Sequence, residues 1–110
     1  MLRIVHHHYG EPAKVLAAVG SGSLDLPPDQ VRVSVSLVPI HPGDLLGIEG
    51  SPAFGEPPSI GPTGRVPGFE GAGVISEVGR DVDPSLRFVP GQRVAFFPAV
   101  SSWAEEVSVA

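Results

Sequence analysis

The sequence contains no cysteine, which excludes a disulfide framework, a thiolate nucleophile and every zinc site built on cysteine. Lysine and arginine together number seven against twelve acidic residues, so the chain lacks the clustered positive charge that nucleic-acid binding requires. No run approaches the roughly 18–20 apolar residues of a membrane span, and the N-terminus has no cleavage site typical of a signal peptide. These absences predict a cytoplasmic protein that binds neither nucleic acid nor membrane.

The composition of the 110 residues favours one small β-rich domain. Apolar residues make up 42% of the chain and charged residues 17%, which is enough apolar material to form a core. Thirteen prolines and fourteen glycines are about twice the usual content, and they disfavour long helices. The sequence therefore predicts a mainly β fold with short strands joined by defined turns.

The clearest predicted strand covers residues 31–37, where valine and leucine alternate with arginine and serine. This alternation is typical of an antiparallel strand with one buried face. Gly71 and Gly73 lie in another apolar run and indicate that a second backbone approaches closely there. Apolar patterns predict further strands at residues 2–7, 15–19, 71–78, 94–97 and 103–109, the first two as an opening hairpin.

Proline and glycine also predict the segments that connect these strands. Pro42 suits the first position of the one short helix that we expect, ending near residue 48. Residues 50–67 contain too many prolines and glycines for a regular ladder, and they predict a long functional loop. Pro90–Gly91 fits the central pair of a type II turn, because glycine tolerates the positive φ that this turn requires.

Four motifs occur in order along the chain and are followed by Trp-Ala-Glu-Glu at residues 103–106. They are Tyr-Gly-Glu-Pro-Ala-Lys-Val-Leu at 9–16, Pro-Ile-His-Pro-Gly-Asp at 39–44, Pro-Gly-Phe-Glu-Gly-Ala-Gly at 67–73 and Pro-Gly-Gln-Arg-Val at 90–94. This ordered set resembles the N-terminal GroES-like domain of the medium-chain dehydrogenase/reductase superfamily. The first and third motifs look most like its zinc-free branch, the quinone oxidoreductases and 2-enoyl thioester reductases.

The resemblance implies an irregular GroES-like β-barrel over residues 1–110, with NADPH and a small-molecule substrate meeting between it and a Rossmann domain. Dinucleotide binding needs Gly-x-Gly-x-x-Gly between a strand and a helix, and the nearest string, at residues 20–25, lacks the third glycine. We therefore expect a chain truncated before the nucleotide-binding domain, inactive until a Rossmann domain joins it in one chain or as a separate subunit. The exposed cleft face predicts a homodimer.

Zinc binding is disfavoured by the residues at the family's ligand positions. In the zinc alcohol dehydrogenases that the domain resembles, a cysteine and a histidine ligate the metal, whereas here His41 and Phe69 stand at those positions. Phenylalanine cannot be a ligand, so we predict metal-free chemistry. Of the run His6, His7 and His8, only the first and last share a strand face, and we interpret all three as partly exposed strand residues.

The resemblance implies hydride transfer from NADPH to a quinone or an enoyl thioester, with a donor that stabilises charge on the substrate oxygen. Phe54 matches the tyrosine that fills this role in the enoyl thioester reductases, and Gly43 replaces a serine or threonine of a proton relay. His41 remains as the candidate catalytic acid and cofactor contact, because imidazole titrates near neutral pH. The alternative is that His41 only caps the helix at Pro42.

Other side chains near this position have predicted supporting roles. Asp44 is expected to hold the helix start through backbone N–H groups, and Glu70 to be an architectural carboxylate that would need a partner such as arginine if buried. Phe54, Phe69 and Trp103 are predicted to line an apolar substrate pocket, with packing in the core as the alternative. The competing hypothesis for the whole chain is a non-catalytic GroES-like module for binding or dimerisation.

Overall fold

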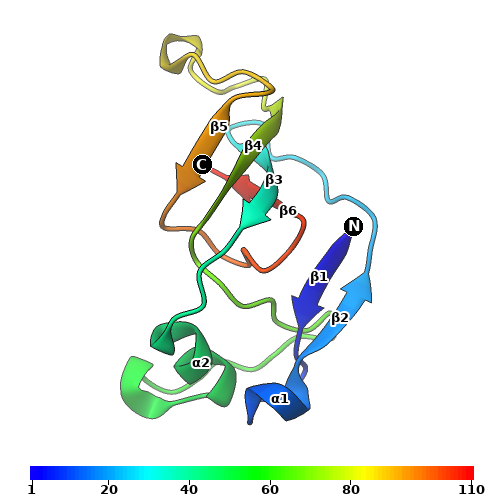
Figure 1. Ribbon diagram of the computed structural model, residues 1–110, viewed down its shortest axis with the longest axis vertical. Helices are drawn as coiled ribbons and strands as arrows, with labels where there is room; N and C mark the ends of the chain where they lie inside the picture. The colour runs from blue at the N-terminus through cyan, green and yellow to red at the C-terminus, as the bar shows by residue number, and fades with distance from the viewer.

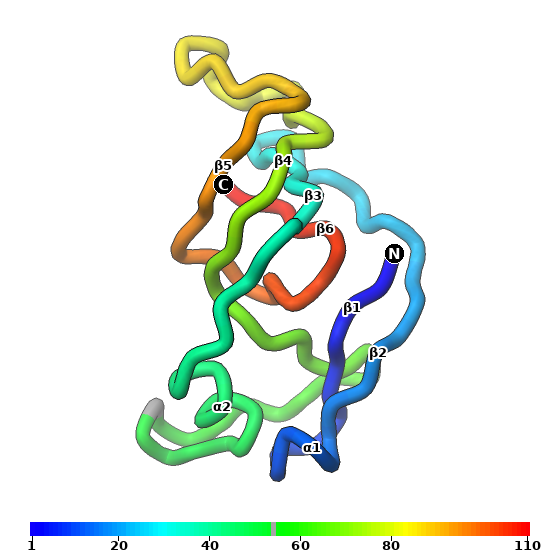
Figure 2. Tube along the Cα trace, in the orientation of Figure 1, coloured from blue at the N-terminus to red at the C-terminus, as the bar shows by residue number. Residues whose placement is uncertain are grey.

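The computed structural model describes residues 1–53 and 55–110, which fold mainly into short antiparallel strands (Figure 1). Figure 2 follows the same path as a continuous trace from the N-terminus to the C-terminus. The elements in chain order are β1 (Leu2–Val5), α1 (Pro12–Val15), β2 (Ala17–Gly20), β3 (Val31–Leu37), α2 (Pro42–Glu49), η1 (Pro52–Phe54), β4 (Gly71–Val78), η2 (Pro84–Leu86), β5 (Arg93–Phe96) and β6 (Glu106–Val109).

A four-stranded antiparallel sheet with the order β5-β4-β3-β6 contains the core. The predicted strand at residues 31–37 is confirmed as β3, which lies at the centre of this order. Val33 is almost fully buried and packs with Phe96 and Val107. It pairs with Ile75 on β4 and with Val107 on β6, so the alternating apolar face of β3 places it at the centre of the sheet.

The close approach predicted for the glycines of residues 71–78 is confirmed. A Cβ atom at Gly73 would lie 2.0 Å from the carbonyl oxygen of Ser34 on β3. A Cβ atom at Gly71 would lie 2.7 Å from the ring of Phe96 on β5. The two glycines therefore let β4 fit between its neighbouring strands.

The predicted turn at Pro90–Gly91 is also present. Gly91 has a φ of +91°, and the N–H of Gln92 donates to the carbonyl oxygen of Val89 at 3.2 Å. This turn leads directly into β5 and allows it to pair with β4.

The opening hairpin forms a second, two-stranded sheet in which β1 pairs with β2. The end of the chain joins the two sheets, because Ile4 N–H donates to the carbonyl of Trp103 and Glu105 N–H donates to the carbonyl of Leu2, both at 2.9 Å. The backbone of residues 103–105 thus runs alongside β1. Strand β6 begins at Glu106, three residues later than the Trp103 start that the pattern predicted. No pairing of β2 with β5 closes a barrel in the described part of the chain.

The first helix differs from the sequence prediction, which had one helix and a strand beginning at residue 15. Pro12 opens the four-residue helix α1, and the N–H groups of Lys14 and Val15 donate to the carbonyl of Glu11. The fixed φ of proline suits a first helical position, and this local preference overrides the apolar pattern that follows. The strand β2 consequently starts at Ala17.

The helix predicted at Pro42 is confirmed as α2, and the predicted long loop follows it. Apart from the single turn η1, the segment from residue 50 to residue 67 contains no helix or strand in its described residues. It runs from α2 to the end of the hairpin, where His6 and Arg65 exchange two backbone hydrogen bonds, and then returns to β4 (Figure 1). None of the described helices has the length and apolar character needed to cross a bilayer.

The prediction of a partly exposed His6 is wrong, because its side chain is fully buried beneath this loop. The Nε2 atom lies 2.9 Å from Nη1 of Arg65, and the Nδ1 atom lies 2.9 Å from the carbonyl oxygen of His8. Since an arginine can only donate, Nε2 is the acceptor and Nδ1 carries the proton. Burial lowers the pKa of His6 below its usual 6.5 and keeps the ring neutral.

We expect the free energy of unfolding to decline as the pH falls from about 6.5 through the lowered pKa of folded His6. Over that interval the unfolded chain binds a proton that the folded chain does not, so acid favours unfolding; above it this contribution to stability is complete. Denaturant titrations at stepped pH measure the decline. His6→Gln should flatten it, whereas His8→Gln, at an exposed histidine, should leave it unchanged. An equal decline in the His6→Gln protein would contradict the assignment.

Candidate functional site

The candidate site is built on the first turn of α2, where His41 is the N-cap in extended conformation. The backbone N–H of Gly43 donates to Nδ1 of His41 at 3.0 Å, and the backbone N–H of His41 donates to Oδ2 of Asp44 at 3.1 Å. The two side chains form a reciprocal capping box, which satisfies N–H groups that a helix start leaves without partners. His41 therefore has the capping role that was considered for it, and Asp44 holds the helix start as predicted.

This cap also fixes which atom His41 presents to solvent. Because Nδ1 accepts a hydrogen bond, the neutral ring carries its proton on Nε2. The Nε2 atom lies 3.9 Å from Oε1 of Glu70 and 3.9 Å from Oδ2 of Asp44, and the His41 side chain is 33% exposed. The site thus offers one oriented N–H donor beside two carboxylates, at a place that solvent reaches.

Phe69 and Gly43 restrict the imidazole ring from two sides. The ring of Phe69 meets that of His41 edge to face, with 4.5 Å between the ring centroids. A Cβ atom at Gly43 would lie only 2.7 Å from Cε1 of His41. A serine or threonine at residue 43, the residue types expected there from the resemblance, would therefore displace the ring from its present position.

The two carboxylates of the site differ in their surroundings. The Asp44 side chain is 2% exposed, and its Oδ1 atom is buried with no hydrogen-bond partner among the described residues. The Glu70 side chain is 38% exposed and forms no ion pair with an arginine in the described part of the chain. Solvent therefore hydrates the Glu70 carboxylate, which does not need the arginine partner that a buried carboxylate would need.

Ser102 and Gly68 support the segment that carries Phe69 and Glu70, and sequence reasoning missed both. Ser102 is fully buried, and its hydroxyl donates to the carbonyl oxygen of Glu70 at 2.9 Å. Backbone hydrogen bonds from Ser102 to Gly68 and from Trp103 to Pro67 join the same two segments. The only available signal was the glycine of the Pro-Gly-Phe-Glu motif, since Gly68 has a φ of +96°.

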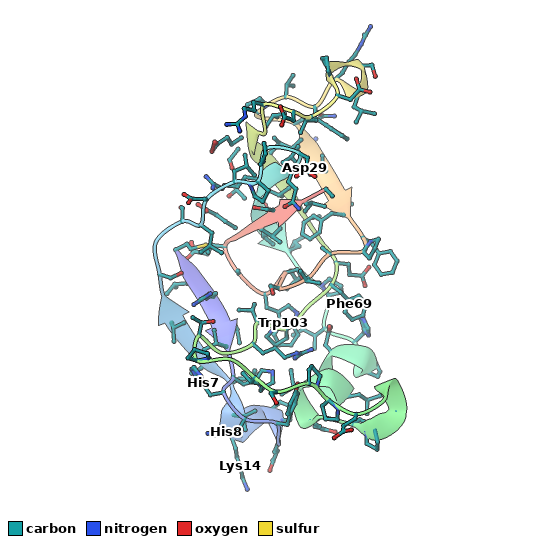
Figure 3. The ribbon with its side chains drawn as sticks, turned by 180° about the vertical axis from the view of Figure 1, so that it is seen from behind. His7, His8, Lys14, Asp29, Phe69 and Trp103 are labelled. Carbon is teal, nitrogen blue, oxygen red and sulfur yellow. The ribbon has the colours of Figure 1, made fainter. Side chains whose placement is uncertain are left out.

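Of the predicted substrate-pocket residues, Phe69 contacts His41, whereas Trp103 lies elsewhere. Trp103 is 9% exposed and lies between the two sheets, while Phe69 lies nearer to α2 (Figure 3). Trp103 borders a mainly apolar groove of about 540 Å³, together with Leu2, Ile4, Leu37 and Ile40, and Phe69 is not part of it. Phe54, the third predicted pocket residue, lies outside the described residues.

The side chains of the site do not fit a zinc ion, and residues 20–25 do not form a dinucleotide-binding turn. Within the described ranges, no three histidine, aspartate or glutamate side chains are placed to hold a metal together, and Phe69 offers only carbon beside His41. Residues 20–25 leave the end of β2 without opening a helix, so they do not form the strand–turn–helix cradle that a pyrophosphate requires.

Comparisons with known proteins agree on the type of domain. Residues 27–108 match the family described as the alcohol dehydrogenase GroES-like domain. The mitochondrial enoyl-[acyl-carrier-protein] reductase of Xenopus tropicalis is 32% identical over 105 residues, which are 94% of this chain and 27% of that protein.

Two solved quinone oxidoreductases have the same fold. The Escherichia coli protein, solved in complex with NADPH, has a TM-score of 0.80 at 26% identity, over 99% of this chain and 31% of its own. The Pseudomonas syringae pv. tomato DC3000 protein has a TM-score of 0.77 at 27% identity, over 98% and 30% of the two chains. The present chain therefore spans less than a third of each of these relatives.

Proposed function

Because the chain belongs to the family of alcohol dehydrogenase GroES-like domains, we propose that it forms the substrate side of an oxidoreductase. The reaction is the reduction of a quinone or an enoyl thioester by hydride transfer from NADPH, and it uses no zinc. The similarity to two quinone oxidoreductases and to an enoyl reductase supports this choice. NADPH is bound mainly by a Rossmann domain outside these 110 residues, so the chain alone is inactive.

The observation that carries the proposal is the oriented Nε2–H of His41. A substrate oxygen that gains charge when hydride arrives needs a hydrogen-bond donor or a proton. His41 donates a hydrogen bond from its neutral Nε2–H to this oxygen and stabilises the charge there, and the proton that completes the reduction comes from solvent, which the partly exposed side chain contacts. The capping box and the ring of Phe69 hold the imidazole in place, so little reorganisation accompanies the hydrogen bond.

The proposal is tested by joining the chain to the nucleotide-binding domain of the Escherichia coli quinone oxidoreductase. NADPH oxidation is followed with a panel of quinones and enoyl thioesters, with the relative's own two domains rejoined as the positive control. We expect turnover by the fusion and none by the chain alone. If the control is active and the fusion reduces neither class of substrate, the enzyme hypothesis is rejected in favour of a non-catalytic binding or dimerisation module.

In the active fusion, His41→Asp should lower kcat by about a hundredfold, the usual size of a lost hydrogen-bond donor to a charged substrate oxygen. Aspartate is a good N-cap but has no N–H to donate, so α2 should keep its start and the thermal midpoint should change little. His8→Asp places the same carboxylate at an exposed histidine outside the site and serves as the matched control. A His41→Asp protein with unchanged kcat would exclude His41 as the donor.

A further inference from the structure

A second concavity of about 610 Å³ opens between β1, the segment at residues 24–27, the loop at residues 58–66 and strand β6. Arg3, Arg32 and Arg65 line it, and we call it the arginine groove. None of the four site residues around His41 takes part in its lining. Any ligand of this groove is therefore independent of the function proposed above.

The charge of the arginine groove is opposite to that of the protein. The chain has a net charge of −5, yet three of its six arginines line this one concavity. Arg32 is neutralised by Glu77 at 2.9 Å and by Glu106 at 3.8 Å. Arg3 and Arg65 form no ion pair with any carboxylate of the described residues, although Asp25 also lines the groove, so the three arginines of the lining outnumber its two carboxylates, Asp25 and Glu106.

Arg3 has a buried donor without an acceptor. Its neighbours Leu2 and Ile4 line the apolar groove beside Trp103, and Arg3 itself lines both that groove and the arginine groove. The Nε atom of Arg3 is buried and has no hydrogen-bond partner in the described residues. A donor removed from water without an acceptor is costly, and an oxyanion in the groove would satisfy it.

Arg65 is held in place by the buried His6. Its Nη1 donates to Nε2 of His6, while its other nitrogens make no hydrogen bond to the described residues and are not among the buried unpaired atoms. These remaining donors therefore keep some contact with solvent, with Nη2 beside Gly47 of α2. The neutral His6 ring fixes the guanidinium without cancelling its charge.

From this arrangement we propose that the arginine groove binds a small organic anion, whose carboxylate or phosphate group is held by Arg3 and Arg65. The groove is also lined by Leu24, Ile60, Val66 and Val100, which would contact an apolar body attached to that group. A volume of about 610 Å³ exceeds what inorganic phosphate alone would fill, and it lies in the ordinary range of ligand sites.

The first test uses the unaltered 110-residue protein with phenyl phosphate, phenylacetate, inorganic phosphate and uncharged benzyl alcohol. Amide resonances are followed by two-dimensional NMR. We expect the two aromatic anions to shift Gly61 and Gly64, which line the groove, and not Gly91 on the distant turn. The tighter of the two anions identifies the preferred oxyanion. Equal binding of benzyl alcohol, or shifts confined to residues outside the groove, would overturn the proposal.

The second test measures affinity by calorimetry in matched charge variants. Arg3→Met and Arg65→Met should each weaken binding by about tenfold or more, because each removes a charge-assisted hydrogen bond. Arg80→Met removes the same charge from an exposed position outside the groove and should bind as the unaltered protein does. Unchanged affinity in Arg3→Met, or an equal loss in Arg80→Met, would refute the site.

Discussion

Replacing Gly73 with alanine should destabilise the protein by about 3 kcal/mol, because the new methyl group has no space between β3 and β4. The Cβ atom would lie 2.0 Å from the carbonyl oxygen of Ser34 and 2.9 Å from Cγ1 of Val33. The first of these neighbours is backbone in the central strand, so the clash can be relieved only by separating the two strands. Val33 is in the core cluster, and the separation would loosen that as well. Denaturant unfolding measures the change in free energy.

Gly20→Ala is the matched control, because a Cβ atom there has no neighbour within 4 Å. Its free energy of unfolding should remain within about 0.5 kcal/mol of the original value, as for surface substitutions in general. A Gly73→Ala protein as stable as the Gly20→Ala protein would show that β3 and β4 do not approach as closely as described.

Gly68→Ala should cost about 4 kcal/mol, through two separate effects. Gly68 has a φ of +96°, where a side chain is strained, and its Cβ atom would lie 2.3 Å from Oγ of Ser102 and 2.4 Å from Cδ1 of Trp103. Both neighbours are buried, so neither can easily move aside. Since Ser102 also bonds the carbonyl of Glu70, the substitution should shift Phe69 and Glu70 relative to His41.

Gly91→Ala separates the two effects, because Gly91 has a similar φ of +91° but no neighbour within 4 Å of the added Cβ atom. It should cost only the backbone strain, about 1–2 kcal/mol. The difference between the thermal unfolding midpoints of the Gly68→Ala and Gly91→Ala proteins therefore measures the loss of stability caused by the steric clash alone. If both substitutions cost the same, the packing of Gly68 against Ser102 and Trp103 does not contribute to stability.

The candidate site could be predicted in part because two of its residues are close in sequence. His41 and Asp44 are three residues apart around Pro42, so one helix turn suffices to bring them together, and a capping role follows from their spacing alone. Phe69 and Glu70 were identified through a motif. Their distances to His41 depend on how the segment from Gly68 to Glu70 docks against Ser102, and no local pattern specifies that contact.

Elements with strong local signals were predicted to within a residue or two, namely β3, α2, β4 and the Pro90–Gly91 turn. Predictions from the apolar pattern failed in two places. At α1 the local preference of proline for a helix start overrode the pattern, and near residue 103 pairing with a distant strand overrode it. Residues 103–105 read as the start of a strand in the four-stranded sheet, but they bond to β1, about a hundred residues earlier in the chain, and the carbonyl of Glu105 also accepts from Val35 on β3.

The sequence by itself determined a mainly β fold without cysteine-based sites, together with the family that its ordered motifs identify. These conclusions depend on composition and on residues that are neighbours along the chain. Only the tertiary structure decided that His6 is buried against Arg65, that Phe69 and Glu70 lie beside His41, and that Arg3 and Arg65 line one groove. Each of these depends on contacts that only folding creates, because burial, side-chain contacts and shared cavities are set by partners outside the local segment.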